Sequence, residues 1–220
     1  MPNTPKDDTK KPEPAATGME KGLTSYGDKG FSLFLRKAFI KGAGYSDKAL
    51  DRPVIGIANT GSAYNPCHGN APQLIEAVKR GVMLSGGLPM DFPTISIHES
   101  FAAPTSMYLR NLMSMDTEEM IRAQPMDAVV LIGGCDKTVP AQLMGAVSAD
   151  VPTILLTGGT ANPAVFRGRQ LGVGTDLWHY IDDVRSGRMS LEEFKDLESA
   201  AGPSSGHCPE MGTASTMAAI

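Results

Sequence analysis

The sequence predicts an α/β fold in which helices flank a parallel sheet. Segments with the apolar pattern of buried strands alternate with segments of helical periodicity, roughly every 30 to 40 residues. The segment 127–134 (DAVVLIGG) is almost entirely apolar, as expected for a parallel strand that is covered on both faces. Glycine and proline are frequent, with 24 and 16 residues among 220, which indicates many tight loops between the elements.

The chain divides into a polar start and one domain. Residues 1–25 are rich in proline, lysine and aspartate, and they predict a flexible N-terminal tail. Residues 26–220 are expected to form a single α/β domain. The last residues, MGTASTMAAI, have the pattern of the first turns of a helix and end without a polar terminus. We therefore expect this domain to be incomplete and to belong to a longer protein.

The first half of the domain contains two predicted strands. Apolar residues at helical spacing predict a helix over 31–44. A buried strand is predicted over 52–60, and it is followed by a helix over 71–87 that ends on two glycines. The segment 92–100 (FPTISIHES) is predicted as the second strand.

The second half continues the alternation. A helix, or two short ones, is predicted over 105–124, before the apolar strand at 127–134. The next helix, over 139–150, has Pro140 in its first turn, where proline is tolerated. A fourth strand is predicted over 151–159.

The segment 176–202 predicts two helices that are separated at Ser186–Gly187. Ser190 and Glu193 have the spacing of a capping box, which places the start of the second helix.

Composition and charge exclude several classes of partner. The net charge is −4, so we expect no nucleic acid and no anionic membrane as a partner. No apolar run approaches the roughly 18 residues that a membrane span needs. The N-terminal residues carry charges and prolines where a signal peptide would have an apolar core, which predicts a cytoplasmic protein. Disulfides are rare there, so each of the 3 cysteines is a candidate for metal binding or catalysis.

The reactive side chains follow the predicted strands. In parallel α/β sheets, ligands bind at the carboxyl ends of the strands, so side chains in the loops there are expected to converge. The candidates are Cys67 after the first strand, Glu99 at the end of the second, and Cys135, Asp136 and Lys137 after the third, with Cys208 in a Gly/Ser/Pro-rich loop before the final helix.

These residue types point to metal chemistry. Three thiolates from separate loops suit a soft metal or an iron–sulfur cluster, although their spacing matches no ferredoxin or zinc pattern. The oxygen ligands Glu99 and Asp136 indicate Mg²⁺. The ammonium of Lys137 would repel such an ion, unless it pairs with a substrate carboxylate or carbon dioxide has converted it into a carbamate.

Four segments resemble the dihydroxy-acid and sugar-acid dehydratase family: NPCHGN, GGLPMDFPTISIHES, GGCDKTVPAQLMGA and GHCPEMGTASTM. That family includes dihydroxy-acid, 6-phosphogluconate, arabinonate and xylonate dehydratases. The resemblance runs from about residue 30 to the last residue. The stretch RNLMSMDTEEMIRAQPMDAVVLIGGCDKTVPAQ is closest to the pentonate branch, the arabinonate and xylonate enzymes.

The resemblance implies a set of metal ligands. Cys67, Cys135 and Cys208 match the three ligands of a [2Fe-2S] cluster, which leaves one iron with an open position. Glu99 and Asp136 match the carboxylates that bind Mg²⁺, and Glu99 stands where the amino acid branch typically has aspartate. Lys137 matches a carbamylated lysine (N6-carboxylysine) that also binds Mg²⁺.

The implied activity is that of a hydro-lyase, which dehydrates a sugar acid such as arabinonate or xylonate to a 2-keto-3-deoxy acid. In the family, Mg²⁺ holds the carboxylate and the C2 hydroxyl, and the open iron helps the C3 hydroxyl to leave. The base is a serine in a later domain, for which this chain has no matching segment. The 220 residues alone are therefore predicted to be inactive. The full-length protein is expected to be a homo-oligomer, a dimer or tetramer, that binds a small-molecule substrate.

Alternatives remain at this point. The chain could belong to a dihydroxy-acid dehydratase of branched-chain amino acid synthesis, a metal-free small-molecule binding domain, or a structural zinc protein. His68, His98 and His207 each adjoin a candidate ligand and are candidates for supporting it or for contacting substrate.

Overall fold

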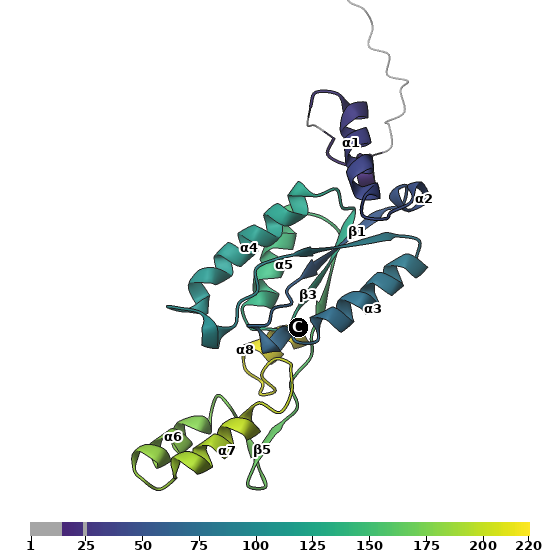
Figure 1. Cartoon of the computed structure of the whole chain (residues 1–220). Coiled ribbons are helices and arrows are strands. Elements are labelled where there is room, and N and C mark those ends of the chain that lie inside the picture. The colour runs from purple at the N-terminus through teal and green to yellow at the C-terminus, as the bar shows by residue number, and fades with distance from the viewer. Residues whose placement is uncertain (1–14, 24–25) are drawn as a thin grey trace, which may run out of the picture.

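A computed structural model of the chain describes residues 15–23 and 26–220, and its centre is a parallel four-stranded sheet (Figure 1). The sheet contains β1 (Val54–Asn59), β2 (Leu88–Pro93), β3 (Ala128–Gly133) and β4 (Thr153–Thr157), in the order β2-β1-β3-β4. Every pair of neighbours is parallel. The predicted α/β fold class is therefore confirmed.

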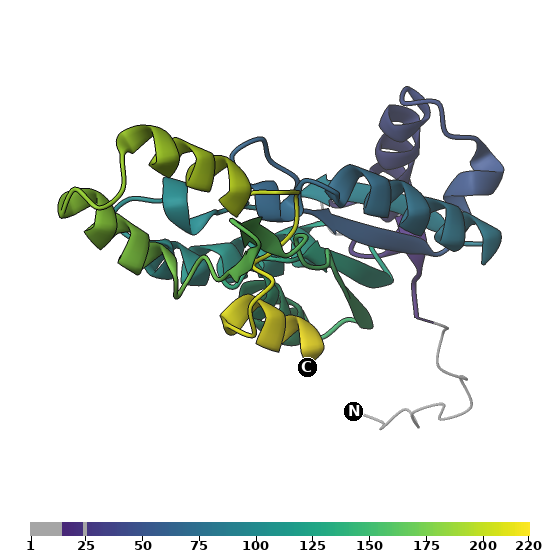
Figure 2. The ribbon, with the colours of Figure 1, turned by 90° about the horizontal axis from the view of Figure 1, so that it is seen from below.

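Helices cover the two faces of the sheet (Figures 1 and 2). Helices α4 (Ser106–Ala123) and α5 (Thr138–Ala149) pack against each other on one face, and α3 (Ala71–Leu84) lies on the other. The apolar side chains of the strands alternate accordingly. Leu131 packs in a cluster with Ile121 of α4, whereas Ile132 packs with Ile75 of α3. In the described part of the chain, no helix is long and apolar enough to cross a membrane.

Part of the segment predicted as a tail is packed against the domain. Residues Gly18–Glu20 form a short 3-10 helix, and Met19 is 3% exposed within the main apolar cluster. The amide of Gly18 donates to both carboxylate oxygens of Asp127, at 3.1 and 2.8 Å, and the amide of Val54 donates to the same carboxylate at 2.8 Å. The rest of the predicted tail, residues 1–14 and 24–25, lies outside the described residues.

The prediction of a strand over 92–100 was wrong in its bounds. Strand β2 begins at Leu88, and the bond from Thr94 N–H to Asn59 O follows its last pair with β1. Beyond it the chain leaves the sheet. The alternating apolar residues Ile95 and Ile97 pack against α4 and α5, around Met113 and Ala141, so their pattern reflects packing onto helices rather than strand pairing.

The first helix begins and ends earlier than the predicted range 31–44, and a second, short helix follows it. Helix α1 spans Lys29–Lys41 and is capped by Asp28, whose side chain accepts from the amides of Gly30 and Phe31. A short helix α2 (Asp47–Leu50) leads into β1, and it was not predicted.

A small lobe follows β4 and projects beyond the carboxyl ends of the strands (Figure 1). Its hairpin of β5 (Ala164–Phe166) and β6 (Arg169–Leu171) was not predicted. Each strand has three residues, and the turn has positive φ at Arg167 and Gly168 (50° and 78°), the conformation of a two-residue hairpin turn.

Two helices complete the lobe, and a third ends the described chain. Helix α6 (Leu177–Arg185) and α7 (Leu191–Ala201) are separated at Ser186–Gly187, as predicted. The capping box of Ser190 and Glu193 is also confirmed. The lobe has an apolar cluster of its own, which includes Phe166, Met189 and Leu197. The final helix α8 (Thr213–Ala219) returns to the sheet and contacts α5.

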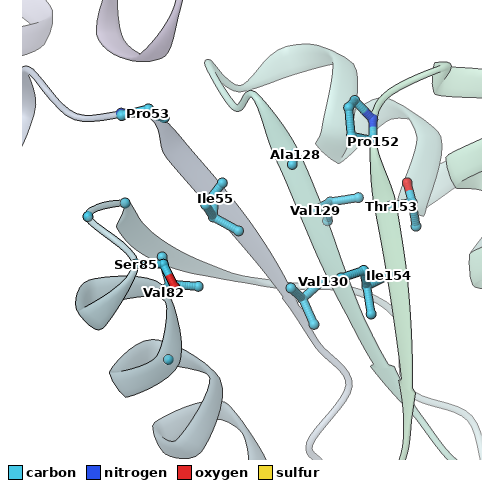
Figure 3. Close-up of a pocket in the computed structure, with 13 residues that line it drawn as sticks. Pro53, Ile55, Val82, Ser85, Ala128, Val129, Val130, Pro152, Thr153 and Ile154 are labelled. Atoms are coloured by element: carbon cyan, nitrogen blue, oxygen red, sulfur yellow. The ribbon is translucent and has the colours of Figure 1, made fainter.

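An apolar pocket of about 490 Å³ lies on the α3 face of the sheet, near the amino ends of the strands (Figure 3). Ile55, Val82, Val130 and Ile154 line it, and Ile154 is 67% exposed. This pocket lies at the opposite end of the sheet from the residues predicted to bind metal.

Candidate functional site

The carboxyl ends of the strands border a pocket of about 550 Å³. Five of the six residues predicted to bind metal line it: Cys67, Glu99, Cys135, Asp136 and Cys208. The sixth, Lys137, lies beside them and forms ion pairs with Glu99 and Asp136. The structure thus brings all six residues together at the place that the strand-end argument predicted.

The first thiol is held in a short turn between β1 and α3. Residues Pro66–His68 form a single turn of 3-10 helix, which α3 follows from Ala71. Cys67 is 6% exposed. Proline at the start of this turn suits its fixed φ and leaves the chain rigid next to the thiol.

The second thiol, Cys135, lies in the turn between β3 and α5 and is 5% exposed. The glycine before it allows this turn to approach the first one. A Cβ atom at Gly134 would lie 3.2 Å from Cys67 O and 3.6 Å from the Cα atom of Gly158. The close contact between the two cysteine turns therefore favours glycine at position 134.

The third thiol arrives from far along the chain and is anchored by backbone hydrogen bonds. The amide of His207 donates to Gly159 O at 3.1 Å, and the amide of Ala161 donates to His207 O at 2.8 Å, after the end of β4. The amide of Gly206 donates to Pro66 O at 3.1 Å, next to Cys67. Cys208 therefore joins the other thiols through contacts with the segment after β4 and with the first cysteine turn, and it remains exposed.

The thiols of Cys67 and Cys135 interact directly. A hydrogen bond from the Cys135 thiol lowers the pKa of Cys67, despite burial that acts against it. The same hydrogen bond raises the pKa of Cys135, and burial raises it further. Burial also raises the pKa of Cys208. Cys135 Sγ lies 3.3 Å from Asp136 Oδ1, so the sulfur atoms adjoin the carboxylate site.

Lys137 lies between two carboxylates, with a side chain that is 9% exposed. Its Nζ atom is 3.6 Å from Glu99 Oε1 and forms a close ion pair with Asp136. Burial alone would lower the pKa of Lys137, but the hydrogen bond and charge of Asp136, together with Glu99, raise it. The ammonium group therefore pairs with both carboxylates and offsets one of their two negative charges.

Two buried histidines, His68 and His207, adjoin the thiols, whereas His98 adjoins Glu99. His68 (3% exposed) donates from Nδ1 to Thr60 O at 2.9 Å and accepts at Nε2 from the amide of Cys135 at 3.2 Å. Burial lowers the pKa of His68, which favours the neutral ring. His207 donates from Nδ1 to Cys208 O at 3.0 Å, and the Ser215 hydroxyl donates to the same oxygen at 2.8 Å.

The pocket wall includes residues that the sequence reasoning missed. Gly174, Thr175 and Glu210 line it, and the first two come from the small lobe. Glu210 accepts from the amides of Val173 and Gly174, and thereby ties the lobe to the segment that carries Cys208. The signal that could have drawn attention to Glu210 was an acidic residue two positions after that cysteine.

The donor set fits the groups that were predicted. Among the residues that the structure describes, no group of three or more His, Cys, Asp or Glu side chains is arranged to hold a single metal ion. The three sulfur atoms line one pocket, however, and an iron–sulfur cluster is bound by thiolates over a larger space than one ion. The hard oxygen atoms of Glu99 and Asp136 beside them suit Mg²⁺.

Residues 52–220 match the model of the dihydroxy-acid/6-phosphogluconate dehydratase N-terminal family. The chain is 45% identical, over 83% of its length, to the L-arabinonate dehydratase of Rhizobium leguminosarum bv. trifolii, and 44% identical, over 75%, to the L-arabonate dehydratase of Azospirillum brasilense. It is 37% identical, over 87%, to the dihydroxy-acid dehydratase of Pyrococcus abyssi. These alignments cover 32%, 28% and 36% of the three relatives, so the chain spans about a third of their length.

Proposed function

The chain belongs to the dihydroxy-acid/6-phosphogluconate dehydratase family through its N-terminal domain, and we propose that it provides the metal-binding part of a hydro-lyase that acts on a sugar acid. The substrate would be an aldonate such as arabinonate or xylonate, and the product a 2-keto-3-deoxy acid. The observation that carries this proposal is the single pocket in which three thiols adjoin two carboxylates and a buried lysine.

In this proposal, Cys67, Cys135 and Cys208 hold a [2Fe-2S] cluster, and Glu99 and Asp136 hold Mg²⁺. When bound, these groups supply Lewis-acid chemistry, which polarises substrate oxygen atoms and helps a hydroxyl group to leave. Three thiols are one fewer than the four ligands of a standard cluster, which leaves room for a substrate oxygen.

Lys137 takes part as a carbamate. The ammonium would first lose one proton, and the neutral Nζ atom would then join the carbon of carbon dioxide and release a second proton, which turns a cation into an anion. The two carboxylates that now pair with the ammonium would then face an added negative group. A site with three anionic oxygen donors suits a divalent cation, and the cation would replace the charge that the ammonium supplies in this structure.

Polar groups on the pocket wall support a hydroxylated substrate. His98, Ser100, Thr175 and Thr213 line the pocket beside the thiols and can form hydrogen bonds with sugar hydroxyls.

The C2 proton of the substrate must be removed by a base. The Ser215 hydroxyl donates to Cys208 O, so it is engaged in holding the third cysteine. We assign the base to the region of the relatives that lies beyond the matched third.

The proposal is tested with a chimera. Residues 1–220 are joined to the remaining two thirds of the R. leguminosarum L-arabinonate dehydratase, and the protein is reconstituted anaerobically with iron, sulfide and Mg²⁺. We expect 2-keto-3-deoxy acid to form from arabinonate or xylonate faster than keto acid forms from a branched 2,3-dihydroxy acid. Asp136→Asn should lower turnover by about 100-fold or more, because loss of groups that merely support a ligand already costs about 10- to 100-fold.

Two outcomes would contradict the proposal. A chimera that contains the cluster but converts only the branched 2,3-dihydroxy acid would assign the chain to amino acid synthesis. A folded chimera that converts neither class, while the parent arabinonate dehydratase is active in the same assay, would contradict a role in dehydration.

A further inference from the structure

His68 links the first cysteine turn to the second. Its Nδ1 atom lies 2.9 Å from Thr60 O, and its Nε2 atom lies 3.2 Å from the amide nitrogen of Cys135. A carbonyl oxygen can only accept, so Nδ1 carries the proton and the lone pair of Nε2 accepts from the Cys135 amide. Both ring nitrogens are used in these bonds, and the imidazole is a bridge within the protein rather than a metal ligand.

The bridge belongs to a buried polar network that reaches β3 and the segments that follow β1 and β2. Thr60, at the end of β1, donates from its hydroxyl to Ile132 O of β3 at 2.7 Å. Asn65 donates from Nδ2 to Ser96 Oγ and Ile97 O, at 3.1 and 3.2 Å, in the segment between β2 and Glu99. The side chains of Thr60 and Asn65 are fully buried, so these bonds are shielded from competing water.

The Cys135 turn needs such an anchor because its own backbone is permissive. Two glycines, Gly133 and Gly134, precede the thiol, and glycine loses more conformational freedom on ordering than any other residue. In the structure this turn is held in close contact with Cys67 O. A hydrogen bond to the amide of Cys135 itself restrains the residue whose sulfur must be placed.

We propose that His68 is a positioning residue, which fixes the backbone of Cys135 relative to Cys67 and so arranges these two thiols before any metal binds. The functional meaning of this arrangement rests on the proposed [2Fe-2S] site. The positioning itself is a property of the metal-free chain, and it is tested there.

Two substitutions at position 68 distinguish the hydrogen bond to Thr60 O from the hydrogen bond with the Cys135 amide. The amide of His68→Gln reaches the position of Nε2 and can accept from Cys135 N–H. The amide of His68→Asn ends near the position of Nδ1, so it can donate to Thr60 O but does not reach Cys135. Both variants place a neutral amide in the same buried site, which makes each the control of the other.

The measurement is residue-resolved amide hydrogen exchange of the metal-free 220-residue chain. We expect exchange at Cys135 to rise about tenfold in His68→Asn and to stay close to wild type in His68→Gln, because only the first loses the hydrogen bond. Exchange at Leu131, within β3, should be unchanged in both. The alkylation rate of Cys135, relative to that of the exposed Cys208, should follow the same order.

Equal exchange at Cys135 in the wild type and both variants would overturn the proposal. So would a selective rise at Cys135 in His68→Gln with Leu131 unchanged. If His68→Asn unfolds, exchange at Leu131 rises as well. Exchange at Cys135 in His68→Gln then tests the proposal. Because no metal is present, a chain that shows the expected exchange but never binds iron would contradict the proposed function and leave the positioning role intact.

Discussion

Cys135→Ser is expected to weaken iron binding by the anaerobically reconstituted chain by about 100-fold or more. Cys135 is the central thiol of the site, because it interacts with Cys67 and its Sγ atom lies 3.3 Å from Asp136 Oδ1. Loss of groups that only support a metal ligand costs about 10- to 100-fold in affinity, and loss of the ligand itself should cost more. The measurement is iron retained per chain after gel filtration under anaerobic conditions.

A control separates this effect from a change in the fold. Ser186→Ala alters an exposed hydroxyl between α6 and α7, in the small lobe, and should retain wild-type iron. Serine at position 135 is close in size to cysteine, so the circular dichroism of the metal-free variant should match that of the wild type. Wild-type iron content with an unaltered visible spectrum in Cys135→Ser would show that this thiol is not a ligand.

Gly206→Ala is expected to lower the free energy of unfolding by about 2 to 4 kcal/mol and to remove Cys208 from the site. Gly206 has a φ of 133°, which side chains rarely adopt, and an added Cβ would lie 2.3 Å from the nitrogen of Ala161. The segment would have to move away from the end of β4. The bonds from Gly206 N–H to Pro66 O and from His207 N–H to Gly159 O would then be lost.

The matched control is Gly81→Ala, which adds the same methyl group inside helix α3. Nothing lies within 4 Å of a Cβ at that position, and alanine favours the helix. Urea unfolding of both variants gives the stability difference, and anaerobic reconstitution gives the iron content. If Gly206→Ala matches Gly81→Ala in both measurements, the backbone contacts do not hold the third cysteine in place.

The sheet could be predicted from the sequence wherever a strand is buried on both faces. The residues of β3 are nearly all apolar, because α4 with α5 covers one face and α3 the other. At Ile95 and Ile97 the same pattern was misleading, since both side chains are buried by helices next to the sheet and not by pairing within it. Periodicity reports that a side chain is buried, and it does not report which element buries it.

The sequence identifies the candidate ligands of the site, but it does not show the contacts that bring Cys208 back to the other thiols or the hydrogen bonds of His68. The rule that parallel strands bring their carboxyl ends together placed Cys67, Glu99 and Cys135 near one another. The return of Cys208 depends on pairing between Thr160 and His207, which are 47 positions apart and carry no local pattern that links them. The role of His68 was open for a similar reason, because the assignment of its two nitrogens requires knowledge of Thr60 O and the Cys135 amide.

The proposed cluster site is tested by counting iron and acid-labile sulfide in the anaerobically reconstituted chain. We expect two iron and two sulfide atoms per chain, the composition of one [2Fe-2S] cluster, with the visible absorption of such a cluster. A chain that is folded by circular dichroism and yet retains no iron, or that binds zinc in its place, would contradict the claim that Cys67, Cys135 and Cys208 together hold this cluster.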